Sequence, residues 1–194
     1  MKKILIILFL FIINVSNVHS IEADVFVQST VNRASLILSK NISKEEKINE
    51  LKSIAKETVD IKAVGFYSLG SKRKSLDEIQ KNQYSKLFEN YFLKSFSSRL
   101  AEYTNPEIEV RDKKVLNENY TIVNSLLIGT SERPEVIIDW RIYTKNPENP
   151  LIRDLIIEGL SLARTQKEEF ASILNSNDGD INMLFKTLEE FSKN

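Results

Sequence analysis

The chain contains no cysteine and a single histidine, His19, among its 194 residues. Without cysteine there can be no disulfide bond, no Cys–His nucleophile and no lipid-modified N-terminal cysteine. Zinc and copper sites are usually built from cysteine and histidine ligands. Such sites are excluded if His19 is cleaved off with the N-terminal segment described in the next paragraph. A Ser-His-Asp mechanism is excluded in the same way. Catalysis would have to rest on Asp, Glu, Lys, Tyr or Ser alone, and no pair of carboxylates is placed on an apolar face. We therefore predict no catalytic residue, no metal site and no cofactor.

The first twenty residues have the layout of a secretory signal peptide. Two lysines precede an unbroken apolar run over residues 4–13, and short side chains follow at 18–20. A membrane anchor is the alternative, but this run is about half the length of roughly 20 residues that spans a bilayer core. We predict that residues 1–20 are a signal peptide cleaved after Ser20, and that the protein works in the periplasm.

The rest of the chain, residues 21–194, is close to electrically neutral. Cleavage removes two lysines and no acid, which leaves a net charge of about −2. This charge argues against nucleic acid as a partner and against strong attraction to anionic membranes. The basic cluster at residues 72–74 fits a solvated loop, with a basic docking patch as the alternative. A chain of this length can bury a core without disulfides, because ~150 residues already bury about 70% of their surface on folding. From the length we expect one domain.

A long helix is predicted from Ser75 to Leu100, a stretch without glycine or proline. Ser75 and Glu78 fit a capping box, in which each side chain binds an unpaired backbone N–H at the helix start. The apolar positions that follow are Tyr84, Leu87, Phe88, Tyr91, Phe92, Phe96 and Leu100. They sweep an arc of about 180°, wider than the ~100° typical of a surface helix. The helix is therefore either buried deep in a core or also lines a cavity.

Shorter helices are predicted on both sides of it from period and capping residues. Ser43 and Glu46 form a second capping box, Asp60 fits an N-cap, and Gly70 fits a helix end that needs a positive φ. The predicted helical ranges are 23–38, 43–55, 61–69, 162–174 and 181–191. Ser161 fits the N-cap of the fourth of these helices.

Between residues 106 and 160 the pattern changes to that of β-strands. Four segments are rich in Ile, Val, Leu and Tyr and are separated by polar turns: 107–111, 120–127, 136–143 and 152–160. The third alternates, with Val136, Ile138, Trp140 and Ile142 on one face. Sequential strands with short connections predict an antiparallel sheet with one covered face, and hence an α+β fold.

Two stretches resemble the MlaC family. The first is Leu69-Gly70 followed by Gln80, Tyr84, Leu87, Phe88, Phe96, Arg99 and Leu100, which is similar to that family's central helix. The second, Asp154 to Leu162, is similar to the family's D-x-x-x-E-G-x-S-L signature, with its downstream Phe at Phe170. The chain departs from the family at Lys72 and Arg73, where aromatic residues are common, and at Pro150, where a tryptophan is usual.

This resemblance implies a periplasmic carrier of phospholipid. The implied fold is NTF2-like, with helices packed on a curved, mainly antiparallel, four-stranded sheet around a deep apolar cavity. The implied partners are phospholipid, an outer-membrane lipoprotein–porin complex and an inner-membrane ABC-transporter complex. The implied role is to move lipid between these complexes and to maintain the lipid asymmetry of the outer membrane.

The aromatic helix and the apolar sheet face have the right chemistry for a lipid cavity. Each CH₂ removed from water is worth ~0.8 kcal/mol, so a two-chain lipid needs on the order of 20 kcal/mol of replacement contacts to leave a bilayer. The predicted lipid-binding residues are Phe66, Leu69, Tyr84, Leu87, Phe88, Tyr91, Phe92, Phe96, Ile138, Trp140, Ile142, Leu155 and Ile157.

Two other functions remain open at this level. An NTF2-like enzyme would need a cavity carboxylate such as Asp139, but strand alternation places Asp139 on the face opposite Trp140. A periplasmic chaperone or scaffold could use the same apolar surface for protein. The signature residues Asp154, Glu158 and Ser161 are expected to be structural, as a strand-end hydrogen-bonding group, a turn residue and a helix cap.

Overall fold

The computed structural model describes residues 20–193. The predicted signal peptide, apart from Ser20, lies outside the described residues. The described helices are α1 (Ala23–Ser39), α2 (Lys44–Thr58), α3 (Ile61–Ser68), the 3₁₀ helix η1 (Gly70–Lys74), α4 (Glu78–Leu100), α5 (Leu162–Asn175) and α6 (Ile181–Lys193). The strands are β1 (Ile108–Asn117), β2 (Tyr120–Leu127), β3 (Val136–Tyr143), β4 (Leu151–Ile157) and β5 (Leu160–Ser161).

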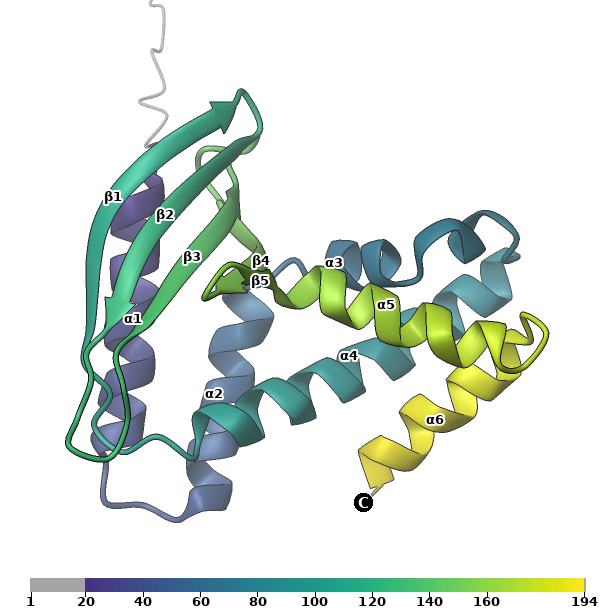
Figure 1. Ribbon diagram of the computed structural model, residues 1–194, viewed down its shortest axis with the longest axis horizontal. Helices are drawn as coiled ribbons and strands as arrows, with labels where there is room; N and C mark the ends of the chain where they lie inside the picture. Colours follow the sequence, from purple (N-terminus) through teal and green to yellow (C-terminus); the bar gives the residue numbers. More distant parts are fainter. Residues whose placement is uncertain (1–19, 194) are drawn as a thin grey trace, which may run out of the picture.

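The strands form one antiparallel sheet in the order β1-β2-β3-β4-β5, so each strand pairs with its neighbour in sequence. The long strands curve, and α1 lies against one face of the sheet across β1 and β2 (Figure 1). The helices α3, α4, α5 and α6 form a second group that extends away from the β4 side (Figure 1). The predicted α+β class is confirmed.

The sheet has five strands rather than the predicted four. The predicted strand over 152–160 is interrupted by a tight turn, in which Glu158 has φ 49° and Gly159 has φ 79°. Positive φ at both central residues is the geometry of the hairpin turns that best match strand twist. The chain therefore folds back, and Leu160 and Ser161 pair with Ile157 and Ile156 as the short strand β5.

Strand β1 is twice as long as predicted, because its second half is too polar to carry a strand signal. The predicted range ended at Arg111, whereas the pairing with β2 continues to Asn117. β1 is an edge strand and is largely exposed, and charged side chains on an edge discourage pairing with other chains. Lys113 also ties this edge to α1, since its Nζ lies 2.7 Å from Glu22 Oε2 and 2.8 Å from Asp24 Oδ1.

The long helix begins two to three residues later than predicted. Its capping box is formed by Asp77 and Gln80, with Gln80 N donating to Asp77 Oδ1 over 2.8 Å and Asp77 N donating to Gln80 Oε1 over 3.2 Å. Ser75 instead closes η1, because its N–H and its hydroxyl both donate to the Lys72 carbonyl. The basic residues 72–74 therefore belong to a 3₁₀ turn rather than to a loop.

The other predicted caps are confirmed. Ser43 and Glu46 form a capping box on α2, Asp60 Oδ1 accepts from Ala63 N on α3, and Ser161 Oγ accepts from Arg164 N on α5. Gly70 follows α3 with φ 61°, as expected for a residue just past a helix end.

The main core lies between the covered sheet face and the helices. Val123, Trp140 and Ile142 point from the sheet into it, and Tyr84 and Phe88 from α4 meet Phe170 and Phe185 there. The predicted alternation of β3 is confirmed, because Trp140 and Ile142 are buried while Ile137 is half exposed. A smaller core joins α1 to α2 through Ile37, Leu38, Leu51 and Ile54.

Within residues 20–193, no helix has the length and apolar character needed to cross a bilayer.

Candidate functional site

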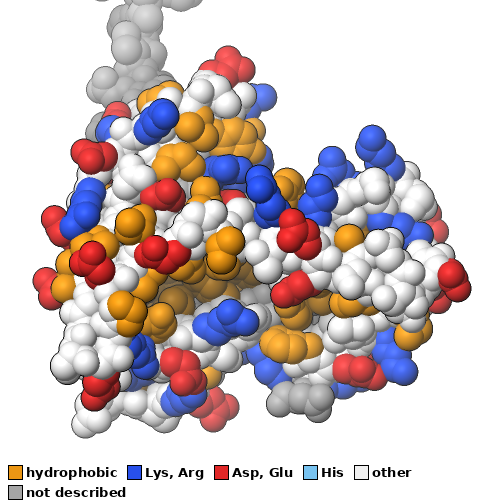
Figure 2. All heavy atoms as spheres, in the orientation of Figure 1, with side chains coloured by type: hydrophobic (Ala, Val, Ile, Leu, Met, Phe, Trp, Pro, Cys, Tyr) orange, Lys and Arg blue, Asp and Glu red, His pale blue; other side chains and the backbone are white. Residues whose placement is uncertain are grey.

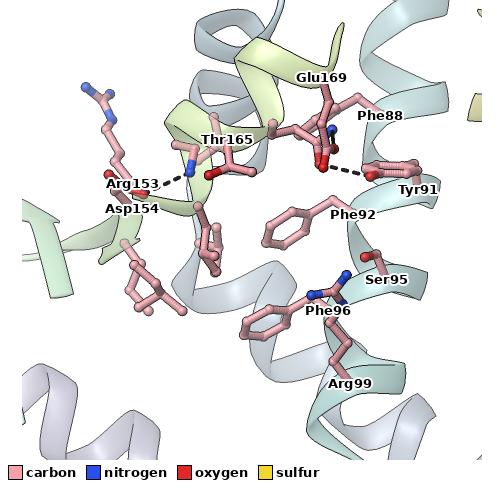
Figure 3. A pocket seen from close by; sticks show the side chains of 17 residues that line it. Phe88, Tyr91, Phe92, Ser95, Phe96, Arg99, Arg153, Asp154, Thr165 and Glu169 are labelled. Carbon is pink, nitrogen blue, oxygen red and sulfur yellow. Dashed lines mark hydrogen bonds between the residues drawn. The ribbon is translucent and has the colours of Figure 1, made fainter. Parts of the chain in front are cut away.

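A pocket of about 180 Å³ opens between α4, α5 and β4. Figure 2 shows a hollow in which hydrophobic side chains gather between the sheet and the helical group. The lining residues, shown in Figure 3, are Val59, Val64, Phe88, Tyr91, Phe92, Ser95, Phe96, Arg99, Ile152, Arg153, Asp154, Leu155, Leu162, Ala163, Thr165, Gln166 and Glu169.

One wall is a row of aromatic rings on α4. Phe88, Phe92 and Phe96 are spaced four residues apart, so they lie one above the other along one side of the helix. The ring centroids of Phe88 and Phe92 are 6.1 Å apart, and those of Phe92 and Phe96 are 5.4 Å apart with an interplanar angle of 10°. Phe92 and Phe96 are half buried, so each presents part of its ring to the cavity.

The inner end of this row is fixed by the core. Phe88 is 2% exposed and meets Phe170 of α5 edge-on at 6.1 Å. Gly65 of α3 packs against Phe88 so closely that a Cβ there would lie 2.6 Å from its ring. Tyr84 is buried one turn before Phe88 and donates its hydroxyl to the Gly65 carbonyl over 2.8 Å. Burial raises the pKa of the Tyr84 phenol far above its usual 10.0.

The opposite wall is the start of α5, which Asp154 of β4 holds in place. Asp154 Oδ2 accepts from Ser161 Oγ over 2.7 Å, and Oδ1 accepts from Ala163 N over 3.0 Å. A carboxylate is stabilised at a helix N-terminus, where backbone N–H groups are unpaired. Glu158 fixes the adjacent hairpin, because its Oε1 accepts from Ile137 N over 2.6 Å. The structural roles expected for Asp154, Glu158 and Ser161 are therefore observed.

A β-bulge turns one arginine away from the pocket. Arg141 pairs with Asp154 and Ile142 with Ile152, which leaves Arg153 as the extra residue. Its guanidinium binds Asp60 Oδ2 and the Tyr120 hydroxyl, at 2.8 Å and 2.7 Å. In Figure 3 the Arg153 side chain points away from the cavity.

The mouth of the pocket is polar. Ser95 and Arg99 contribute from α4, and Thr165, Gln166 and Glu169 contribute from α5. Tyr91 joins the two helices, because its hydroxyl donates to Gln166 Oε1 over 2.9 Å. Gln166 Nε2 in turn donates to Glu169 Oε2 over 2.9 Å. Burial raises the pKa of the Tyr91 phenol, and the hydrogen bond to Gln166 partly offsets that shift.

The structure places the predicted lipid-binding residues in two groups. Five line the pocket: Phe88, Tyr91, Phe92, Phe96 and Leu155. The other eight do not line it: Phe66, Leu69, Tyr84, Leu87, Ile138, Trp140 and Ile142 lie in or against the main core, and Ile157 is a half-buried residue of β4. The sheet contributes β4 rather than β3 to the cavity, and Trp140 on β3 donates its Nε1–H to Ser125 Oγ over 2.8 Å.

Sequence reasoning missed the α5 wall, the polar mouth and the small aliphatic floor. Leu162 is the last residue of the family signature, and Ala163 follows it. That signature is the one sequence signal that could have indicated these two residues. Val59 follows the end of α2, Val64 lies on α3 and Ile152 lies on β4, and no sequence period relates them. Asp139 does not line the pocket and accepts a hydrogen bond from Asn124 Nδ2 over 2.7 Å. Residues 20–193 hold no cluster of His, Cys, Asp and Glu suited to a metal ion.

Comparisons with known proteins agree on the fold. A phospholipid-binding protein from Ralstonia solanacearum, solved in complex with a phospholipid, superposes with a TM-score of 0.74 at 18% sequence identity. The match covers 89% of this chain and 98% of that one. A comparison with curated proteins finds no match. The family model described as MlaC protein matches residues 28–190, which is most of the sequence, and the chain therefore belongs to the MlaC family.

Proposed function

We propose that this protein binds phospholipid in the pocket between α4, α5 and β4. The observation that carries the proposal is the division of the pocket into an apolar interior and a polar mouth. Phe92, Phe96 and Leu155 offer contacts to hydrocarbon, while Arg99 and Glu169 lie at the exposed end. A phospholipid has the same division, and the Ralstonia protein of the same fold was solved with one bound.

The size of the pocket indicates how such a ligand would enter. A cavity of about 180 Å³ has room for on the order of a dozen water-sized groups, since each needs roughly 10–15 Å³ by this measure. That room suits part of the hydrocarbon of a two-chain lipid. We infer that loading separates α4 from α5, because these two helices form the facing walls and meet at the mouth through the Tyr91–Gln166 hydrogen bond.

We further propose that the protein carries this lipid through the periplasm. In this proposal residues 1–20 are a cleaved signal peptide and residues 21–194 act as one lipid-binding domain. The partners are an outer-membrane lipoprotein–porin complex and an inner-membrane ABC-transporter complex, and the outcome is maintenance of outer-membrane lipid asymmetry. Membership of the MlaC family supports it.

Binding rather than catalysis is the activity that we assign to the site. Asp154 lines the pocket, but its two carboxylate oxygens accept from Ser161 Oγ and Ala163 N. The other pocket carboxylate, Glu169, is exposed to solvent at the mouth of the pocket.

A vesicle transfer assay tests the proposal. Donor vesicles carry a fluorescent phospholipid, acceptor vesicles carry a quencher, and the purified protein is added between them. We expect transfer with wild type and its loss in Phe92→Glu, because a carboxylate in the apolar interior is costly to desolvate. The matched control is Tyr67→Glu, at an exposed aromatic residue on α3 outside the pocket. Equal transfer by wild type and Phe92→Glu would contradict the proposal.

A further inference from the structure

Two charges of opposite sign face the mouth of the pocket from different helices. Arg99 lies in the last turn of α4 and Glu169 in the middle of α5, and both side chains are exposed. Both belong to the pocket lining (Figure 3). Within residues 20–193 neither forms a salt bridge, although eleven such contacts join other residues there.

Arg99 differs in this respect from the other arginine of the pocket. The guanidinium of Arg153 is held by Asp60 and Tyr120 and points away from the cavity. Arg99 has no such partner in the described residues, and Ser95 lies one turn before it along α4. A guanidinium fork with a neighbouring hydroxyl provides several donors in the geometry that phosphate oxygens accept.

Glu169 lies farther along the mouth, beside Tyr91. Its one hydrogen bond within the described residues comes from Gln166 Nε2, so its carboxylate keeps free acceptor positions. Tyr91 and Arg99 are eight residues apart, which is ~12 Å along a helix axis. The long side chain of Arg99 shortens the gap between the two charges. Both charges act on the Tyr91 phenol, because Glu169 raises its pKa and Arg99 lowers it.

We propose that this charge pair makes the pocket selective for zwitterionic phospholipids with a primary ammonium group, over phospholipids with net negative charge. Arg99 and Ser95 bind the phosphate, and Glu169 accepts from the ammonium. An anionic headgroup satisfies Arg99 equally well but places no cation against Glu169. The inference rests on the proposed function and adds the headgroup class.

Competitive loading tests this selectivity. Protein stripped of lipid is incubated with vesicles that hold phosphatidylethanolamine and phosphatidylglycerol in equal amounts, with identical acyl chains. The protein is then re-isolated, and its lipids are extracted and quantified by mass spectrometry. We expect wild type to enrich the ethanolamine lipid about two- to fivefold, the effect of one exposed ion pair. Glu169→Gln should bring the ratio of the two bound lipids close to one.

The arginine is tested in the same assay. Arg99→Gln should lower the loading of both lipids about two- to fivefold, because both carry the phosphate. The matched controls are Glu168→Gln and Arg164→Gln, which change exposed residues of α5 outside the pocket lining. Both controls should keep the wild-type ratio and the wild-type total.

The outcomes separate the two proposals. A wild type that loads lipid normally but without enrichment overturns the headgroup selectivity and leaves lipid binding intact. A Glu169→Gln protein that keeps the enrichment, or a Glu168→Gln protein that loses it, also overturns the selectivity. A folded wild type that takes up no lipid at all overturns the proposed function itself.

Discussion

Leu155→Trp is the substitution that most directly separates a pocket wall from packed core. Leu155 lines the pocket from β4 and is half buried. Tryptophan adds about six heavy atoms, which would displace about as many methylenes at ~0.8 kcal/mol each, on the order of 5 kcal/mol. Such a loss predicts phospholipid binding weaker by about a thousandfold or more, because each 1.4 kcal/mol is tenfold in affinity.

The fold should tolerate this change, since the added ring enters open space. In closed core, overpacking costs roughly 1–3 kcal/mol, or a melting temperature lower by about 2–12 °C in a chain of this size. The control is Ile138→Trp, on β3, which packs against the main core without lining the pocket. Lipid titration and thermal melting should show binding lost in Leu155→Trp and kept in Ile138→Trp. The reverse pattern would refute the placement of the binding wall on β4.

Three further substitutions test how the site is supported. Phe88→Ala removes a buried ring and should cost about 3–5 kcal/mol, which thermal melting would show as a fall of about 6–20 °C; a fall below 3 °C would contradict its place in the core. Asp154→Asn removes the charge at the start of α5 and should cost about 1–3 kcal/mol, measured by chemical denaturation, whereas an unchanged midpoint would show that α5 needs no such anchor. Burial raises the pKa of Tyr84, so the unfolded chain loses this proton first, and stability is full below about pH 10 and falls as the pH rises further. Melting curves from pH 8 to 11 should show a shallower fall in Tyr84→Phe, and identical slopes would contradict this reasoning.

Much of the fold could be predicted from local patterns. The alternation over β3 and the caps at Ser43, Asp60 and Ser161 are signals of a few adjacent residues, and the structure confirms each of them. The prediction was wrong where two local signals competed. Ser75 with Glu78 and Asp77 with Gln80 both fit a helix start, and the second pair forms it because η1 takes up Ser75.

The candidate site was less predictable, because its walls come from segments far apart in sequence. The aromatic period of α4 identified Phe88, Phe92 and Phe96, but it could not show which element faces them. An apolar strand face predicted Trp140 and Ile142 as the opposite wall, and the structure buries both in the core instead. The bulge at Arg153 and the hairpin at Glu158 bring β4 and α5 to that position.

Native mass spectrometry of the protein isolated from the cell envelope tests the central claim most directly. The proposal predicts a population heavier by the mass of one phospholipid, which tandem fragmentation should identify by its headgroup and acyl chains. Leu155→Trp, purified in parallel, should lack that population and keep the charge-state distribution of a folded protein. Wild type and Leu155→Trp that both appear without any lipid adduct, or both carry the same one, would contradict the assignment of this pocket as the phospholipid site.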